Sequence, residues 1–200
     1  MASVVMALTG EPGAGKSTAV QWFAGHGAAV LDADQIVRVL WHGEMLLQAA
    51  RGRWGRAVFN ADGTINKKAV SQVIFSDKKE YLWLCGKIYP VVYEEMRKNI
   101  PGAGITVAEI PMLFEAGRPE WVDRVLFMTA DAEIRARRNR FRGLDENELR
   151  RRERFFLNRE ERIKRSDWVI CNNGDVEKLY LSLGKIWDEL KGLEKKASNV

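Results

Sequence analysis

A glycine-rich segment near the start of the chain carries the clearest chemical signal. Residues 10–17 (GEPGAGKS) match the phosphate-binding loop (P-loop) pattern G-x-x-x-x-G-K-[ST], between an apolar run and a helical segment. Its glycines let the backbone curl until N–H groups face phosphate oxygens, and the following helix adds the positive end of its dipole. Lys16 should reach the β- and γ-phosphates, and the Ser17 hydroxyl should bind Mg²⁺. We therefore predict a site for ATP and Mg²⁺ formed by Gly10, Gly13, Ala14, Gly15, Lys16, Ser17 and Thr18.

Four carboxylates stand where they could act beside bound phosphates. Asp32 and Asp34 follow a second apolar run, and both should face the P-loop because ligands bind beyond the carboxyl ends of parallel strands. One of them could accept a proton from an attacking hydroxyl, whereas capping the next helix is the alternative use. Glu109 and Glu115 could hold a water on Mg²⁺, since hard cations prefer carboxylate oxygens, although Glu115 could equally be a cap or a surface charge.

Positive charge is concentrated late in the sequence. The formal net charge is +5, and twelve arginines lie between Arg135 and Arg165. Few apolar residues could bury these helices, so the arginines should pair with neighbouring glutamates or face an anionic partner. One or two should reach the transferring phosphate, because a guanidinium stabilises the charge on its oxygens. The charge pattern alone does not single out which.

Apolar runs that alternate with amphipathic segments predict the scaffold for these residues. Strands buried on both faces of a parallel sheet are expected at 4–8, 28–31, 105–110, 125–128 and 168–170. Helices are expected at 17–24, 35–41 and 176–190. The stretch 43–100 is helical in character, with breaks at 60–63, 76–77 and Pro90, and 135–165 indicates two helices joined at Gly143. The predicted fold is α/β, with helices on the parallel sheet and a helical insertion after the second strand.

Length and composition exclude several other classes of protein. Two hundred residues, 46% of them hydrophobic, fit one domain with a sizeable core, and the apolar runs are too short to span a membrane. The N-terminal segment lacks the basic start of a secretory leader, and the cysteines and histidines lack the spacing of a zinc site. We expect an unexported, cytoplasmic protein in which Cys85 and Cys171 are reduced and buried.

Four segments match a known family in order and spacing. They are LTGEPGAGKST at 8–18, VLDAD at 30–34, IPMLFE at 110–115 and SDWVICNNG at 166–174. With weaker similarity between them, these segments resemble the dephospho-coenzyme A kinase family over nearly the whole chain. The P-loop is shared by many families, but the other three segments together are much more specific.

The resemblance implies an architecture and a set of roles. It implies a P-loop NTPase-type core at about 1–34, 101–132 and 166–200, a helical acceptor-binding insert at about 35–100 and a helical lid at about 133–165. By similarity, Asp34 matches the aspartate proposed as general base, and the stretch from Arg138 to Arg142 matches lid arginines near the transferred phosphate. The predicted catalytic residues are Lys16, Asp34, Arg138 and Arg142. The loop predicted to lie near adenine is Asn172, Asn173 and Gly174, and the predicted metal ligands are Ser17 and Glu115.

Three positions depart from the residue that is common in this family. Glu11 stands where glycine is common, Lys67 where arginine is common, and Tyr89 where histidine is common. A carboxylate at position 11 is compatible with bound phosphates only if it points away from them. Lysine cannot reproduce the planar fork of arginine, so the contacts to the acceptor are the ones most affected.

The sequence thus predicts transfer of the terminal phosphate of ATP to the ribose 3′-hydroxyl of dephospho-coenzyme A, with no nucleic-acid or membrane partner. One alternative is a kinase for another small acceptor, such as a nucleoside monophosphate. The other is a nucleotide-switched protein whose basic segment binds nucleic acid, for which no recognisable nucleic-acid module is present. The oligomeric state cannot be predicted from the sequence.

Overall fold

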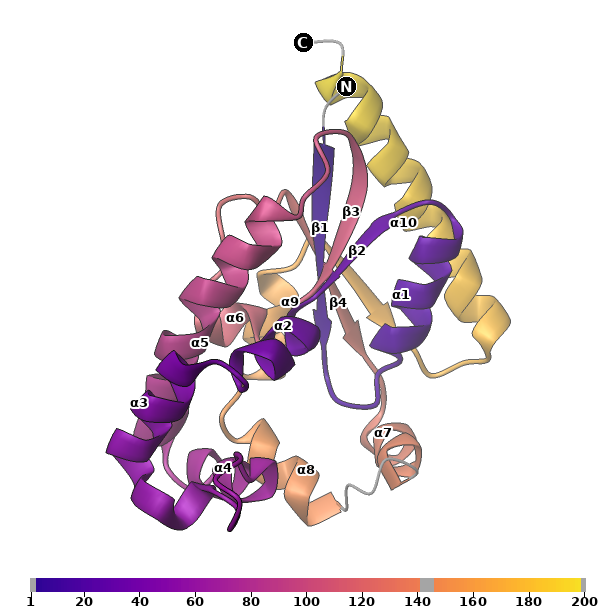
Figure 1. Ribbon diagram of the computed structural model, residues 1–200. Coiled ribbons are helices and arrows are strands. Elements are labelled where there is room, and N and C mark those ends of the chain that lie inside the picture. The colour runs from indigo at the N-terminus through magenta and orange to yellow at the C-terminus, as the bar shows by residue number, and fades with distance from the viewer. Residues whose placement is uncertain (1–2, 141–145, 199–200) are drawn as a thin grey trace.

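A five-stranded parallel sheet forms the centre of the computed structural model, which describes residues 3–140 and 146–198 (Figure 1). The strand order is β2-β3-β1-β4-β5. The middle strand, β1, is buried at every residue after the first, because both of its faces are covered. All five predicted strands are confirmed: β1 (Ser3–Gly10), β2 (Ala29–Asp32), β3 (Gly104–Glu109), β4 (Arg124–Thr129) and β5 (Trp168–Cys171).

Two residues of the outer strands, Val30 and Cys171, are exposed although the sequence predicts them to be buried. β2 and β5 have four residues each and neighbour only one strand. Val30 in β2 is therefore 36% exposed rather than buried. Cys171 in β5 is exposed and Cys85 is half-buried, and both are free thiols.

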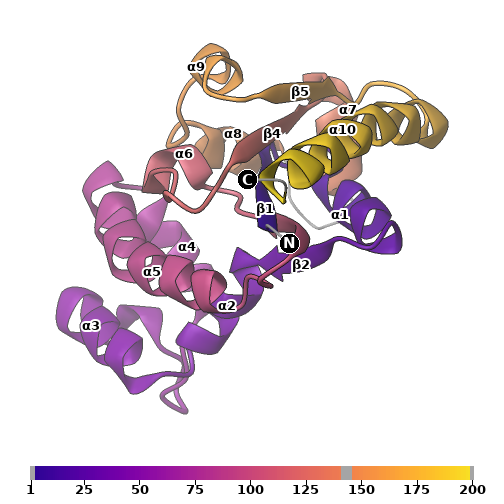
Figure 2. The same ribbon diagram turned by 90° about the horizontal axis from the view of Figure 1, so that it is seen from above.

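Two helices cover one face of the sheet (Figure 2). They are α1 (Lys16–Gly25) and α10 (Val176–Ala197), which agree with the predicted helices at 17–24 and 176–190. Since successive strand residues point to opposite faces, Met6 and Leu8 of β1 pack in this layer with Phe23, whereas Val5 and Ala7 pack on the other side. The contacts of Met6 and Leu8 with Phe23 hold α1, and with it the P-loop, against the sheet.

The opposite face is covered by helices that lie between β2 and β3, here called the insertion (residues 33–98). Its elements are α2 (Ala33–Leu40), α3 (Glu44–Trp54), the 3₁₀ helix η1 (Gly55–Val58), α4 (Lys67–Ile74) and α5 (Lys78–Lys98). The short helix α6 (Leu113–Ala116) follows β3. The predicted breaks at 60–63 and 76–77 are confirmed, but the one at Pro90 is wrong. α5 continues through Pro90 because Ile88, Val92 and Met96 are buried on both sides of it, and this packing outweighs one lost backbone hydrogen bond.

The arginine-rich segment (residues 132–164) connects β4 to β5. Its described residues form three helices rather than the predicted two: α7 (Ala132–Arg140), α8 (Glu146–Glu153) and α9 (Arg159–Lys164). The extra helix starts where the Asn158 side chain accepts a hydrogen bond from the Glu161 N–H, at 2.8 Å. The predicted junction Gly143 lies outside the described residues. The helices α3, α4, α7 and α8 lie beyond the carboxyl ends of the strands, whereas α5 extends along the sheet (Figure 1). Within the described residues, no helix is long and apolar enough to cross a membrane.

Candidate active site

The loop between β1 and α1 is curled back on itself, as the P-loop pattern predicts. The Lys16 ammonium donates to the carbonyl oxygens of Gly10 at 3.0 Å and Glu11 at 3.2 Å. Gly13 and Gly15 have φ values of 79° and 99°, a backbone region that side chains disfavour. The loop backbone therefore needs glycine at these two positions.

Glycine is also required because neighbouring side chains lie against the loop. A Cβ atom on Gly13 would lie 2.5 Å from Nδ2 of Asn139, and one on Gly15 would lie 2.4 Å from Nδ2 of Asn172. The Asn172 amide donates to the carbonyl oxygen of Ala14 at 2.9 Å. The P-loop is thus enclosed by α7 on one side and by the segment after β5 on the other.

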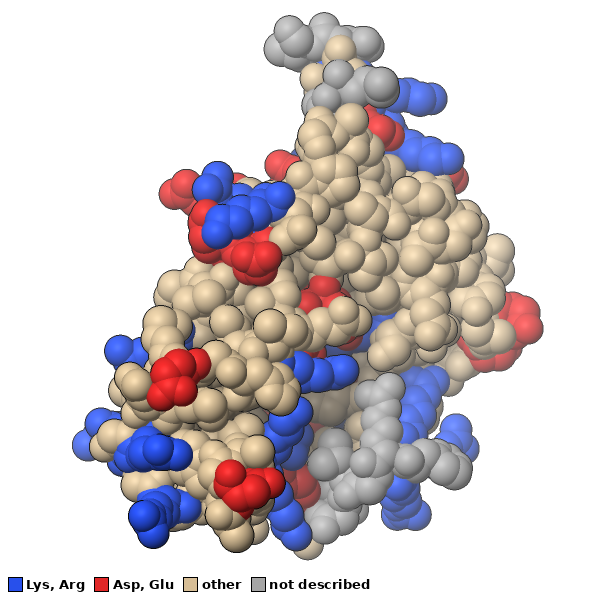
Figure 3. Space-filling model, viewed as in Figure 1, with Lys and Arg blue, Asp and Glu red and all other residues tan. Residues whose placement is uncertain are grey.

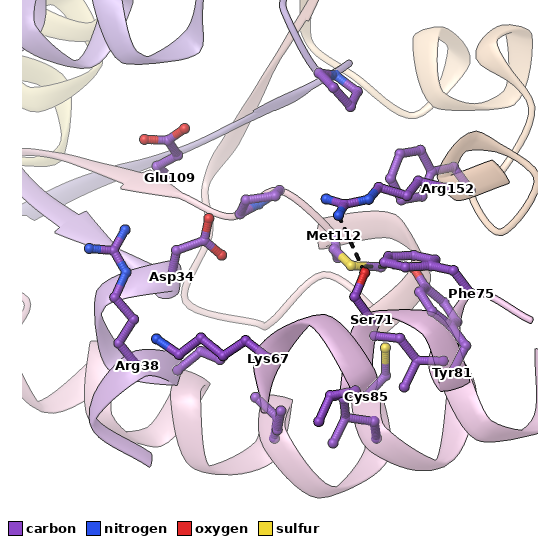
Figure 4. A pocket seen from close by; sticks show the side chains of 18 of the residues that line it. Asp34, Arg38, Lys67, Ser71, Phe75, Tyr81, Cys85, Glu109, Met112 and Arg152 are labelled. Carbon is purple, nitrogen blue, oxygen red and sulfur yellow. Dashed lines mark hydrogen bonds between the residues drawn. The ribbon is translucent and has the colours of Figure 1, made fainter. Parts of the chain in front are cut away.

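A cavity of 760 Å³ opens from the P-loop toward the insertion. Lys16 and Ser17 line it together with the charged residues Asp34, Arg38, Lys67 and Glu109. Figure 4 shows these four charged side chains at one end of the cavity, with Phe75, Tyr81, Cys85 and Met112 at the other. Arg152 also lies at this second end, where it donates to the hydroxyl of Ser71 at 3.3 Å. The cavity therefore has a polar end beside the phosphate site and a largely apolar end in the insertion.

The two aspartates after β2 play different structural parts. The Asp32 carboxylate caps α2, accepting from the N–H groups of Asp34 at 2.8 Å and Gln35 at 3.2 Å. Asp34 lies in the first turn of α2 and extends into the cavity (Figure 4). Asp32 is therefore the residue that caps the helix, which is the alternative role that the sequence leaves open for both aspartates. The Asp34 carboxylate faces the cavity instead.

The surroundings of Asp34 raise the pKa of its carboxyl group above the ordinary value of 3.8. Solvent in the cavity reaches the residue, but the protein around it reduces hydration of the charged form, and the charge of Asp32 adds to the effect. Lys16 and Arg38 oppose the shift because their positive charges favour the carboxylate. A raised pKa improves a carboxylate as a proton acceptor.

The two candidate metal-binding glutamates lie in different places. Glu109 lines the main cavity. The carboxylate of Glu115 accepts a hydrogen bond from the N–H of Leu157 at 2.9 Å and does not line that cavity. Burial raises the pKa of Glu115, although that hydrogen bond opposes the shift. Glu109, unlike the predicted metal ligand Glu115, therefore lines the same cavity as Ser17.

A second cavity, of 280 Å³, lies on the other side of the P-loop. Thr18, Arg138, Asn172 and Gly174 line it, as the resemblance to a nucleotide loop implies. Arg138 donates to the carbonyl oxygens of Gly13 at 3.2 Å and Asn172 at 3.1 Å. Asn173 instead accepts from the N–H of Asp131 at 2.8 Å, which ties the segment after β5 to the start of α7.

Many of the other described arginines form ion pairs. Glu148 pairs with Arg151 and Arg152, and Glu161 pairs with Arg165. The predicted catalytic residue Arg142 lies outside the described residues. On the face seen in Figure 3, many Lys and Arg side chains gather over the insertion and α7. Positive surroundings of this kind favour a polyphosphate ligand.

The three departures from the family pattern take distinct positions. Glu11 is 3% exposed and lines neither cavity. Its carboxylate points away from the phosphate site, as a working P-loop requires. Lys67 lines the polar end of the main cavity, and Tyr89 is a largely buried part of the cavity wall.

Among the polar residues of the main cavity that sequence reasoning missed are Arg38, Asn139 and Arg152. Arg38 follows Asp34 by four residues, the spacing that places two side chains on one helix face, so this signal was available. Asn139 lies within the arginine-rich segment, and no sequence pattern distinguishes it from its neighbours.

A parallel sheet of this strand order, with a P-loop between its first strand and first helix and a cavity lined by charged side chains beside that loop, defines a P-loop kinase. A family model described as dephospho-CoA kinase matches residues 4–178. The chain therefore belongs to the dephospho-CoA kinase family.

Individual relatives agree with this assignment. The chain is 34% identical to the dephospho-CoA kinase of Methylococcus capsulatus over 177 residues, which cover 86% of this chain and 89% of that protein. A Thermus thermophilus protein of known structure is 30% identical, with a TM-score of 0.79 and coverage of 95% and 99% of the two chains. The dephospho-CoA kinase of Campylobacter jejuni, at 20% identity and a TM-score of 0.63 over 98% and 99% of the chains, shares the fold.

Proposed function

We propose that this protein transfers the γ-phosphate of ATP to the ribose 3′-hydroxyl of dephospho-coenzyme A, which yields ADP and coenzyme A in the last step of coenzyme A biosynthesis. The main support, beside the family, is that one cavity contains Lys16, Ser17 and Asp34 and continues into an apolar end. Its volume of 760 Å³ is in the range of sites for substantial small molecules. A site for the acceptor is thus joined directly to a site for the transferred phosphate.

Each side chain in this proposal has a role that fits its position. The N–H groups of the P-loop and the Lys16 ammonium hold the phosphates and neutralise developing charge. Asp34 orients the 3′-hydroxyl and accepts its proton. Arg138, beside the second cavity, contacts the phosphates of ATP, and Asn172 and Gly174 border the base. Positioning and electrostatics then supply most of the rate acceleration.

Magnesium fits the oxygen-rich polar end of the cavity. The Ser17 hydroxyl and the Glu109 carboxylate are hard oxygen ligands, and Glu109 replaces Glu115 in our assignment because only Glu109 lines the cavity. Within the described residues, no cluster of three or more His, Cys, Asp or Glu side chains could hold a metal by itself. In our proposal the ion is held jointly by the side chains of Ser17 and Glu109 and by the nucleotide phosphates, where it would neutralise their negative charge.

The parts of the chain divide according to these roles. We assign the core to about 1–34, 101–132 and 166–200, the acceptor-binding insert to about 35–100 and the lid to about 133–165. The lid would exclude water from the γ-phosphate and so limit wasteful hydrolysis of ATP. We place the reaction in the cytoplasm, where ATP and Mg²⁺ are abundant.

An acceptor panel tests the proposal directly. The purified protein is incubated with Mg-ATP and dephospho-coenzyme A, a nucleoside monophosphate or shikimate, while ADP release and the phosphorylated product are measured. We expect product only with dephospho-coenzyme A. Efficient phosphorylation of another acceptor, or no reaction with dephospho-coenzyme A, would contradict the proposed function, and salt-sensitive binding of RNA or DNA would favour the nucleic-acid alternative, which the family does not favour.

The raised pKa of Asp34 predicts how turnover depends on pH. A protonated Asp34 cannot accept a proton, so kcat should fall as the pH is lowered through a pKa that lies above 3.8. Asp32→Asn removes the neighbouring negative charge, so it should lower the pKa of Asp34 and move the acid limb of the profile to lower pH. Profiles of kcat against pH at saturating substrates measure both. An acid limb that stays in place or moves to higher pH in Asp32→Asn would be inconsistent with this assignment.

A further inference from the structure

Glu11 is an almost fully buried carboxylate within the P-loop. Its residue exposure is 3%, and one carboxylate oxygen accepts a hydrogen bond from the Thr129 hydroxyl at 2.5 Å, at the end of β4. Its N–H donates to the carbonyl oxygen of Met128 at 3.0 Å. Burial of a charge is costly unless the charge is paired, so its partners decide what it does.

Two arginines from different helices converge on this carboxylate. Nε of Arg135, in α7, lies 3.2 Å from Oε2 of Glu11, and Nη2 of Arg162, in α9, lies 3.5 Å from Oε1. Arg135 also donates to the carboxylate of Glu153, in α8. One side chain of the P-loop is therefore tied to α7 and α9 directly and to α8 through Arg135.

The carboxylate also separates two positive charges that would otherwise repel each other. Arg162 is 7% exposed, and its guanidinium lies over the rings of Phe127 and Phe156, at 5.1 Å and 5.6 Å from their centroids. Burial and the charge of Arg135 lower the pKa of Arg162, and Glu11 opposes this shift. Without Glu11, the arginine-rich segment would hold two close positive charges with less compensation.

The same contacts set the place of Arg138. Arg138 follows Arg135 by three residues, about one helical turn, and donates to the carbonyl oxygens of Gly13 and Asn172. α7 is thus held on the P-loop at two points, the Glu11 carboxylate and the Gly13 carbonyl. A shift of α7 at the first point would move Arg138 at the second.

We propose that Glu11 is a positioning residue of the phosphoryl-transfer site, whose carboxylate holds α7 and α9 against the P-loop and thereby places Arg138. Its effect on turnover rests on the proposed function, whereas its effect on the two helices does not. The departure from glycine at this position is then part of how this chain attaches its arginine-rich segment.

Glu11→Gln tests the inference, since it keeps the shape and an acceptor for Thr129 but removes the charge. We expect kcat to fall roughly ten- to hundredfold, as for residues that orient catalytic groups, with KM for dephospho-coenzyme A nearly unchanged. The fraction of ATP hydrolysed without acceptor phosphorylation should rise. Amide hydrogen exchange should become faster in α7 and α9 while α10 is unaffected.

Glu160→Gln is the matched control, because Glu160 is an exposed carboxylate in α9 whose loss changes the net charge equally. It should behave as wild type in every assay. Combining Glu11→Gln with Arg162→Gln should reduce kcat less than the product of the two single effects, because the residues act as a pair. Should Glu11→Gln not fold, Glu11→Asp, which keeps the charge on a shorter stem, is measured in the same way.

The outcomes are distinguishable from failure of the proposed function. The inference would be overturned if Glu11→Gln left unchanged the kcat, the fraction of ATP hydrolysed without acceptor phosphorylation and the amide hydrogen exchange of α7 and α9. It would also be overturned if the loss of kcat in the double variant equalled the product of the two single losses. A wild-type protein that leaves dephospho-coenzyme A unphosphorylated would refute the proposed function, and in that case the exchange of α7 and α9 alone decides whether Glu11 holds them.

Discussion

Replacing Lys16 with alanine is expected to lower turnover by at least roughly a hundredfold, or about 2.7 kcal/mol of transition-state stabilisation. The Lys16 ammonium lies over the P-loop, within hydrogen-bond distance of the Gly10 and Glu11 carbonyl oxygens, and lines the main cavity. From there it can contact the phosphates of ATP as their charge redistributes during transfer. Initial rates at saturating Mg-ATP and dephospho-coenzyme A measure the loss.

The control for this variant is Lys185→Ala, which removes an exposed lysine of α10 that is distant from the P-loop in sequence and lines neither cavity. It should retain wild-type turnover. Thermal unfolding of both variants separates a catalytic loss from a loss of fold, because Lys16→Ala also removes two hydrogen bonds within the loop. A folded Lys16→Ala variant with near-normal turnover would exclude Lys16 from the mechanism.

The second large effect is expected for Asp34→Asn, which should also lose at least roughly a hundredfold in kcat. Asparagine has nearly the same shape and can still hydrogen-bond to the acceptor hydroxyl, but it cannot accept the proton. KM for the acceptor should therefore change much less than kcat. Steady-state kinetics with varied dephospho-coenzyme A measure the two constants separately.

Asp32→Asn is the informative comparison, because it replaces the other aspartate with a residue that also caps helices well. We expect it to keep α2 intact and to lower turnover far less than Asp34→Asn. If instead Asp32→Asn caused the larger loss, the base would have to be assigned to Asp32. Such a result would reverse the distinction drawn from the capping hydrogen bonds of Asp32.

The sheet and its covering helices could be predicted because burial leaves a direct trace in the sequence. The core of β1, for example, is a continuous apolar run, and such a run is typical of a strand that is covered on both faces. The predicted break at Pro90 is wrong because proline usually ends a helix locally, whereas the buried residues of α5 stabilise this helix through tertiary packing. The third helix of the arginine-rich segment was missed because its apolar seam is thin and its start depends on a single Asn158 cap.

The site was predicted in part for the same reason. The P-loop and Asp34 have fixed places relative to the strand ends, so their convergence follows from the topology. Our proposal of Glu109 in place of Glu115 as metal ligand, and the burial of Glu11 between two arginines, depend on which side chains meet across distant segments. Such pairings between residues far apart in the sequence leave no periodic signal in a single sequence.

The brevity of β2 and β5 has a consequence for how this molecule meets other copies of itself. An outer strand exposes a row of backbone donors and acceptors on which a foreign strand can be added, and long outer strands are frequent starting points for aggregation. With four residues each, these two offer very few such groups. Any specific self-association should therefore use helical surfaces rather than continuation of the sheet.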